Sequence, residues 1–430
     1  MGPRRRPTAH QATETSESDC SDACDPQEEH HNVRSKERSP SGHSKGENKE
    51  GKLIKRLVFG TLLLFMLCGI IAAGHLWTML FVILIQWTMF RELVNVRYHQ
   101  RRFKDIPLFR TSQWGWFYAC VLLSYGQALS KPGASQLIRS KLLLSCLPYV
   151  EFISFVLYSI LLVGTVLTLR PGKYKYQMGQ LAWTISIVVI TVVQVHCFSA
   201  NILRGLFWFL FPVSLVICND SMAYFCGMGF GRKFIKRPFL GDLSPNKTWE
   251  GFIGGGICTV VFAFASAPLY PTFTVCPCEE LNLMGGFIVR HMCELPSSFI
   301  AEAYELPWWM GGANGSTVTL YPIRLHALVL GLFASVVAPF GGFFASGIKR
   351  AYNLDDFASI IPGHGGVYDR VDCQLIMGLA THSYYVTFIR GAQLSTARLL
   401  QLALTLPDGE KVELYKSLGV ALKQEGLSLR

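Results

Sequence analysis

Long apolar runs constrain this chain more than any other feature of its sequence. Several are long enough to cross a bilayer as a helix, which takes about 20 apolar residues. Lipid offers the backbone no hydrogen-bonding partner, so such runs are expected to fold as helices. We predict an all-α, polytopic membrane protein of about nine transmembrane helices. Their expected ranges are 54–74, 76–92, 113–130, 143–168, 180–198, 202–225, 250–269, 325–346 and 372–390.

The composition agrees with this class, since half of the 430 residues are apolar and 16% are charged. The formal charge of +11 does not indicate nucleic-acid binding. Basic residues of membrane proteins gather in cytoplasmic loops, where they meet anionic lipid headgroups. Residues 1–52 are polar and contain almost no large apolar side chains, so we expect a disordered cytosolic tail there.

The distribution of basic residues predicts the orientation. With the N-terminus in the cytosol, the loops on that side carry most of the Lys and Arg residues of the membrane region, as the positive-inside rule requires. The polar segments 226–249 and 346–372 then lie on the same face, because one helix carries the chain out between them and the next carries it back. We therefore predict one cytosol-facing site built from both segments.

The densest cluster of charge follows the eighth apolar run. It contains Lys349 and Arg350, a Gly-rich turn at 362–366, and then Asp369-Arg370-Val371-Asp372. Charge of this density between apolar segments is costly unless it serves chemistry. Asp369 and Asp372 are three residues apart and share one face of a helix, and paired carboxylates suit Mg²⁺. The turn frees backbone N–H groups for an anion, and the basic pair adds counter-charge.

A second polar cluster begins at the end of the sixth expected helix. Asp220 follows the apolar run 205–218, and a carboxylate there is costly without a cation or hydrogen-bond donors. Spaced glycines and basic residues follow at 227–233, and then the run Ser-Pro-Asn-Lys-Thr-Trp-Glu-Gly at 244–251. Spaced glycines alone resemble a phosphate loop only loosely, so the combination carries more information than any single motif.

The first of these clusters closely resembles the signature of phosphatidate cytidylyltransferases of the eukaryotic type, also called CDP-diacylglycerol synthases. That signature reads Ser-x-apolar-Lys-Arg, then four residues, Lys-Asp, and later His-Gly-Gly-x-x-Asp-Arg-x-Asp. The second cluster is similar to the family's other conserved block. Asp355 and Asn246 stand where the family has or favours lysine. The residues that match the signature are Ser346, Ile348, Lys349, Arg350, Asp356, His364, Gly365, Gly366, Asp369, Arg370 and Asp372.

This resemblance implies transfer of CMP from CTP to phosphatidic acid, giving CDP-diacylglycerol and pyrophosphate. It implies Mg²⁺ as cofactor and leaves room for a second, monovalent, cation. The implied metal ligands are Asp220, Asp369 and Asp372. The implied catalytic set adds Lys349, Arg350, His364 and Arg370. The implied substrate-binding residues are Arg232, Lys233, Ser244, Lys247, Gly365 and Gly366.

Structural roles are open for the same residues. Asp369 and Asp372 would instead serve as an N-cap and a salt-bridge partner of Arg370, and Asp220 as a buried, hydrogen-bonded acid. The basic residues would anchor the chain at headgroup level. Ser244 would cap a helix that starts near Thr248, and His364 would stabilise its turn.

Further expectations concern organisation and partners. We expect N-terminal transmembrane helices at 53–200, a catalytic transmembrane region at 201–390 and a C-terminal tail at 391–430. The resemblance implies the endoplasmic reticulum membrane, with CTP, phosphatidic acid and membrane lipids as partners. A homodimer is a separate expectation, because the sequence does not determine the oligomeric state. Three alternatives are a related CTP-dependent lipid-modifying enzyme, a cation transporter that uses the three acids as an ion path, and a non-enzymatic scaffold.

Overall fold

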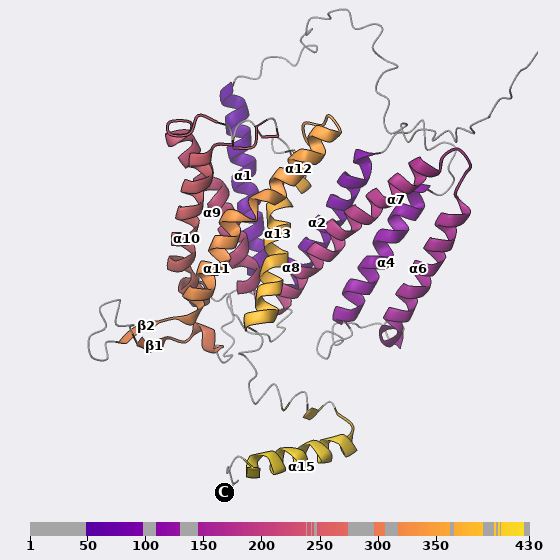
Figure 1. Ribbon diagram of the computed structural model, residues 1–430, viewed down its shortest axis with the longest axis vertical. Coiled ribbons are helices and arrows are strands. Elements are labelled where there is room, and N and C mark those ends of the chain that lie inside the picture. Colours follow the sequence, from indigo (N-terminus) through magenta and orange to yellow (C-terminus); the bar gives the residue numbers. More distant parts are fainter. Residues whose placement is uncertain are drawn as a thin grey trace, which may run out of the picture. The chain divides into compact units, whose positions relative to one another are not determined.

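The structure is a computed structural model that describes residues 49–97, 109–129, 145–237, 239–241, 243–244, 247–273, 296–305, 317–361, 365–389, 400, 403–404 and 406–424. Residues Leu53–Arg430 form one compact unit. Helices dominate it (Figure 1), so the predicted all-α class is confirmed. The tail at 1–48, His364, Pro245, Asn246 and the tail around 390–399 lie outside the described residues.

Of the helices in the N-terminal half, α2, α4, α6 and α7 run side by side in Figure 1. α7 and α8 continue into each other through a π-helical turn at Val189–Val193. The resulting segment is 30 residues long, which exceeds the length needed to cross a bilayer. The helices of this half are α1 (Lys49–Ala72), α2 (His75–Val96), α4 (Phe109–Leu129), α6 (Val150–Leu167), α7 (Tyr174–Val188) and α8 (Gln194–Leu203).

The C-terminal half builds the part of the bundle that holds both polar clusters. Here α9 packs against α10, α11 and α13, and α12 packs against α13. Strands β1 (Glu302–Glu305) and β2 (Thr317–Leu320) pair in antiparallel register before α11, so the described residues contain one small hairpin besides the helices. The helices are α9 (Phe207–Phe230), α10 (Trp249–Ser266), α11 (Pro322–Val336), α12 (Pro339–Ala351), α13 (Tyr368–Tyr384) and α15 (Asp408–Gln424).

A helix is present in each of the nine ranges predicted from hydropathy. Within the described residues, six helical segments are long and apolar enough to cross a membrane: 75–96, 147–167, 174–203, 207–230, 249–270 and 322–351. A shorter apolar helix covers Gly60–Ala72. The multi-pass character is therefore confirmed, whereas the count of nine stays a prediction.

Small residues let α10 pack closely against its neighbours. Gly251, Gly255, Thr259 and Ala263 recur every fourth residue and are all buried. A Cβ added at Gly255 would lie 2.8 Å from the backbone nitrogen of Ala223 on α9. In lipid, where apolar surface alone drives little association, such stripes allow helices to approach and gain van der Waals contact. This contact fixes α9, and with it the polar residues that α9 carries.

Two helix boundaries differ from the prediction. The helix expected at 202–225 runs from Phe207 to Phe230, so Asp220 lies ten residues before its end rather than at its end. The helix expected at 325–346 is divided into α11 and α12, because Pro339 at the start of α12 has no N–H group to continue the ladder. Its second half, α12, carries Lys349 in the last turn.

Candidate active site

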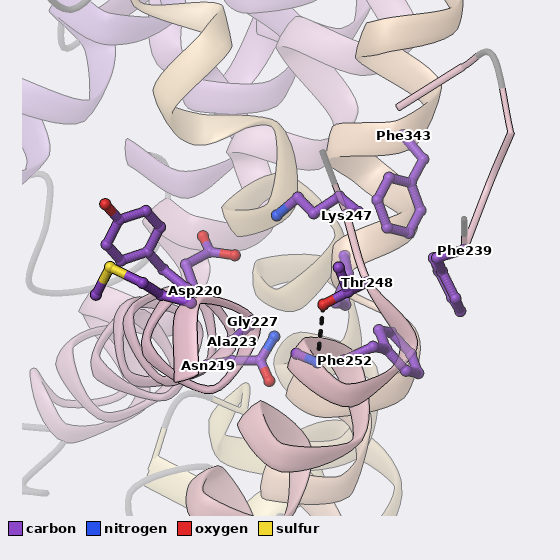
Figure 2. A pocket seen from close by; sticks show the side chains of 13 residues that line it. Asn219, Asp220, Ala223, Gly227, Phe239, Lys247, Thr248, Phe252 and Phe343 are labelled. Carbon is purple, nitrogen blue, oxygen red and sulfur yellow. Dashed lines mark hydrogen bonds between the residues drawn. The ribbon is translucent and has the colours of Figure 1, made fainter. Parts of the chain in front are cut away.

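A cavity of about 440 Å³ lies where α9, α10 and α12 meet the segment around Lys247. Figure 2 shows the carboxylate of Asp220 and the ammonium group of Lys247 directed into the space between these elements. The charge of Lys247 acts favourably on Asp220, as does the charge of Arg370 from α13. The lining residues are Asn219, Asp220, Ala223, Tyr224, Gly227, Met228, Phe239, Lys247, Thr248, Gly251, Phe252, Pro339 and Phe343.

The wall formed by the start of α10 is built by two local interactions. Thr248 is the N-cap, and its hydroxyl accepts a hydrogen bond from the Gly251 N–H at 3.2 Å (Figure 2). Glu250 accepts backbone N–H groups of Arg232, Phe234 and Ile235 at 3.2, 3.0 and 2.7 Å. The carboxylate therefore ties the basic loop after α9 to the first turn of α10.

The crossing of α12 and α13 brings Asp372 into the same region. A Cβ added at Gly341 would lie 2.5 Å from the Asp372 carbonyl oxygen. One added at Gly342 would lie 3.4 Å from the Asp372 carboxylate. The absence of side chains at both positions lets the two helices meet. The negative charges of Asp220 and Asp372 act on each other, so two acids from separate helices gather here.

Asp369, in contrast, is occupied by contacts with α12 and with the chain between α12 and α13. Its Oδ1 accepts a hydrogen bond and ion pair from Lys349 Nζ at 2.8 Å. Its Oδ2 accepts the backbone N–H groups of Phe357 and Gly366, both at 3.1 Å. These three donors occupy both carboxylate oxygens of a side chain that is only 4% exposed. Asp369 thus clamps the segment before α13 to α12.

The glycine pair of the turn has a steric explanation. Gly365 has a φ of 81°, in the left-handed region that favours glycine. An added Cβ there would lie 2.9 Å from the Asp356 carboxylate. At Gly366 it would lie 3.0 Å from a carboxylate oxygen of Asp369 and 3.0 Å from one of Glu92. Glycine is therefore favoured at Gly365 by the backbone conformation and at Gly366 by the close carboxylates.

Comparison with known proteins shows the family of this chain. The sequence profile of the cytidylyltransferase family matches residues 54–388. The chain belongs to the cytidylyltransferase family. It is 40% identical over 375 residues to a probable phosphatidate cytidylyltransferase of Dictyostelium discoideum, covering 86% of this chain and 78% of that protein.

Relatives from animals and plants match over a similar length. Phosphatidate cytidylyltransferase 1 of Rattus norvegicus is 40% identical over 362 residues, covering 83% of this chain and 76% of the relative. The protein of the same name in Arabidopsis thaliana is 38% identical over 362 residues, covering 83% and 84%. Family membership therefore extends across both halves of the transmembrane region.

The three-carboxylate metal site of Asp220, Asp369 and Asp372 stays a prediction for this cytidylyltransferase. Within the described part of the chain, no three His, Cys, Asp or Glu side chains are grouped to hold a metal ion. The physical reason is the position of Asp369, whose oxygens face Lys349 and two N–H groups. Asp220 and Asp372 remain as a pair, which is the kind of donor set that Mg²⁺ shares with substrate phosphates.

The other predicted residues are distributed around this pair. Arg370 and Arg350 are exposed on α13 and α12. Arg232 and Lys233 are exposed in the loop after α9 and do not line the cavity. Ser244 is half-buried, and Thr248 rather than Ser244 caps α10. His364 lies outside the described residues, so its role stays a prediction.

Glu92 on α2 was not among the site residues predicted from the sequence. Its side chain is buried, and its carboxylate accepts the backbone N–H groups of Val367 and Tyr368, both at 2.8 Å. One signal was present in the sequence, because an acid near the end of an apolar run needs a donor. Nothing in the sequence pattern identified a donor so distant along the chain.

Proposed function

We propose that this cytidylyltransferase transfers CMP from CTP to phosphatidate, giving CDP-diacylglycerol and pyrophosphate. Its relatives carry the name of this activity. The observation that carries the proposal is a cavity between apolar helices that Asp220 and Lys247 line, with the charge of Asp372 acting on Asp220. That position suits a reaction between a water-soluble nucleotide and a lipid phosphate.

The proposed chemistry needs no nucleophilic side chain. An oxygen of the lipid phosphate attacks the α-phosphorus of CTP, a new P–O bond forms, and the α–β bond breaks to release pyrophosphate. Both reactants are anions, so the enzyme's task is to position them and to offset charge. The charges of Lys247 and Arg370 act on Asp220, and the charge of Lys349 acts on Asp372.

We propose Mg²⁺ as the cofactor, held by Asp220 and Asp372. Two neighbouring carboxylates repel each other unless a cation or a proton lies between them. The charges of Asp220 and Asp372 repel each other in this way. When bound, the ion would neutralise phosphate charge and polarise the P–O bonds. Asp369 and Lys349 would not bind the ion themselves, and their ion pair would fix the start of α13 against α12.

We further propose that an acyl chain of the lipid lies in an open apolar groove along α12. The groove is lined by Leu240, Leu243, Phe340, Phe343, Phe344, Gly347, Ile348, Ala351 and Tyr352. Phe343 lines both the groove and the polar cavity. A lipid with its phosphate on the polar side of this ring would have its tail on the apolar side.

The proposed location is the endoplasmic reticulum membrane, and the proposed assembly is a homodimer. The six apolar helical segments support a multi-pass membrane protein. Fluorescence co-localisation with an endoplasmic reticulum marker tests the first proposal, and the mass of the purified protein in detergent tests the second. A monomer mass would remove the homodimer from the proposal.

One assay tests the function as a whole. Purified protein is supplied with CTP, Mg²⁺ and a panel of phospholipids and lipid alcohols, and pyrophosphate release is followed. We expect release with phosphatidate and none with the other lipids. Release with another lipid alone would indicate a different CTP-dependent enzyme. The position of Asp220 inside α9 is also compatible with a path for cations through the membrane. That alternative is tested separately, by measuring cation flux into liposomes without CTP.

A further inference from the structure

The start of α13 lacks the usual local cap. Val367 is the N-cap residue, and no side chain of its own segment satisfies the first turn. The first N–H groups of a helix have no partner within the helix and require one elsewhere. Here a carboxylate from α2, far away in the sequence, takes that place.

The geometry of this contact is close and complete. Glu92 Oε1 accepts the Val367 N–H at 2.8 Å, and Oε2 accepts the Tyr368 N–H at 2.8 Å. Glu92 as a whole is 2% exposed. Charge-assisted bonds of this length at a helix N-terminus are among the stronger polar contacts in proteins. Both carboxylate oxygens are thereby directed at the backbone of the signature segment.

Glu92 and Asp369 act on successive amides. The Gly366 N–H donates to Asp369 Oδ2 at 3.1 Å, and the next two N–H groups donate to Glu92. Gly366 contacts both carboxylates closely, since a Cβ there would lie 3.0 Å from each. The backbone from Gly366 to Tyr368 is therefore held from two sides, once by its own helix and once by α2.

The held segment determines where the site residues point. Asp372 lies one helical turn beyond Tyr368, and successive turns of a helix share one face. A change in the start or axis of α13 therefore moves Asp372 relative to Asp220 on α9. Glu92 itself does not line the cavity, so its effect on the reaction is indirect.

We infer that Glu92 is a positioning residue that fixes the start of α13 and so places Asp372 opposite Asp220. This inference rests on the proposed function, because it assigns Glu92 to the same site. It also implies that α2, from the N-terminal half, is part of the catalytic unit.

The test compares Glu92→Gln and Glu92→Ala with the wild-type enzyme. Glutamine keeps the length of the side chain and one acceptor oxygen, whereas alanine removes both. We expect kcat per folded enzyme to fall at least tenfold in Glu92→Gln and further in Glu92→Ala. We also expect the Mg²⁺ concentration for half-maximal activity to rise, because Asp372 is displaced. Hydrogen exchange of the amides at 366–368 should accelerate in both variants.

A matched control changes another buried polar residue of α2. Gln86 is 1% exposed and accepts a hydrogen bond from Tyr125 at 2.9 Å, away from α13. Gln86→Leu should leave the kcat per folded enzyme, the Mg²⁺ requirement and the exchange at 366–368 as in the wild type. A lower melting temperature in Glu92→Gln with unchanged kcat per folded enzyme and unchanged exchange would overturn the inference. An inactive wild type would instead refute the proposed function, while the exchange measurement would still test Glu92.

Discussion

The contrast between Asp369 and Asp372 gives the sharpest test of the site. Both belong to the same signature, but they have different surroundings. Asp369 pairs with Lys349, whose side chain is 16% exposed, and accepts two backbone N–H groups. Asp372 accepts the adjacent Cys373 N–H at 2.7 Å and is opposed by the charge of Asp220. Asparagine at the two positions should therefore have different consequences.

Asp369→Asn should mainly destabilise the fold. It leaves the Lys349 ammonium group without its counter-charge in a nearly buried place. Breaking a buried ion pair costs about 3–5 kcal/mol, and we take about 3 kcal/mol because Lys349 keeps some contact with water. That loss corresponds to a fall of roughly 3 °C in the melting temperature for a chain of this size.

Asp372→Asn should have the opposite profile. It removes a charge that Asp220 opposes, so the melting temperature should stay constant or rise. Removal of one of two proposed metal ligands should lower kcat at least 100-fold, which is about 2.7 kcal/mol of barrier. The measurements are thermal unfolding in detergent and pyrophosphate release per folded enzyme. Equal melting temperatures and equal activities for the two variants would refute the assignment of separate roles.

A double variant checks the cause of the destabilisation. Lys349→Met combined with Asp369→Asn removes both charges of the pair. Replacing both partners of a buried pair is far less costly than removing one. The double variant should therefore recover part of the melting temperature lost in Asp369→Asn. A further fall of the same size would mean that the ion pair does not explain the loss.

Three other predictions concern the cofactor, the helix contacts and the lipid. EDTA should abolish pyrophosphate release and added Mg²⁺ should restore it, whereas activity that persists in EDTA would exclude the cofactor. Gly255→Ala should cost about 1–3 kcal/mol by overpacking against Ala223, and an unchanged melting temperature would refute that contact. Gly347→Leu should fill part of the groove and so lower kcat/KM for dioleoyl but not for dihexanoyl phosphatidate. The fold should tolerate the change, because an added Cβ at Gly347 meets only Leu243, at 3.8 Å. Gly164→Leu, at a helical glycine with open space, is the control. An equal ratio of kcat/KM for the two phosphatidates in both variants would refute the proposed acyl-chain groove.

The sequence predicted the elements of the fold better than their ends. Long apolar runs report burial in lipid directly, so a helix was found in each expected range. Hydropathy reports less about where a helix stops, because a polar residue that faces a cavity looks the same as one at a helix end. Asp220 shows this, since α9 continues for ten residues beyond it.

The site was predicted in its components but only partly in its geometry. Charge and spacing singled out Asp372 and Asp369 as a pair on one helix face. They did not reveal that Lys349 and two backbone amides would occupy Asp369. Glu92 was missed because its partners are main-chain groups in another part of the chain. Backbone donors carry no residue type, so only coordinates identify such contacts.

The position of Asp220 within α9 has a consequence for how substrates reach the enzyme and how products leave it. The carboxylate lies ten residues before the end of α9, which is about 15 Å along the helix axis. In the proposed reaction the lipid remains in its leaflet, and the soluble triphosphate reaches the site from the water. When the bond breaks, one product is free to diffuse back into water while the other is already among lipids. The two products would therefore separate by solubility alone, which disfavours the reverse reaction.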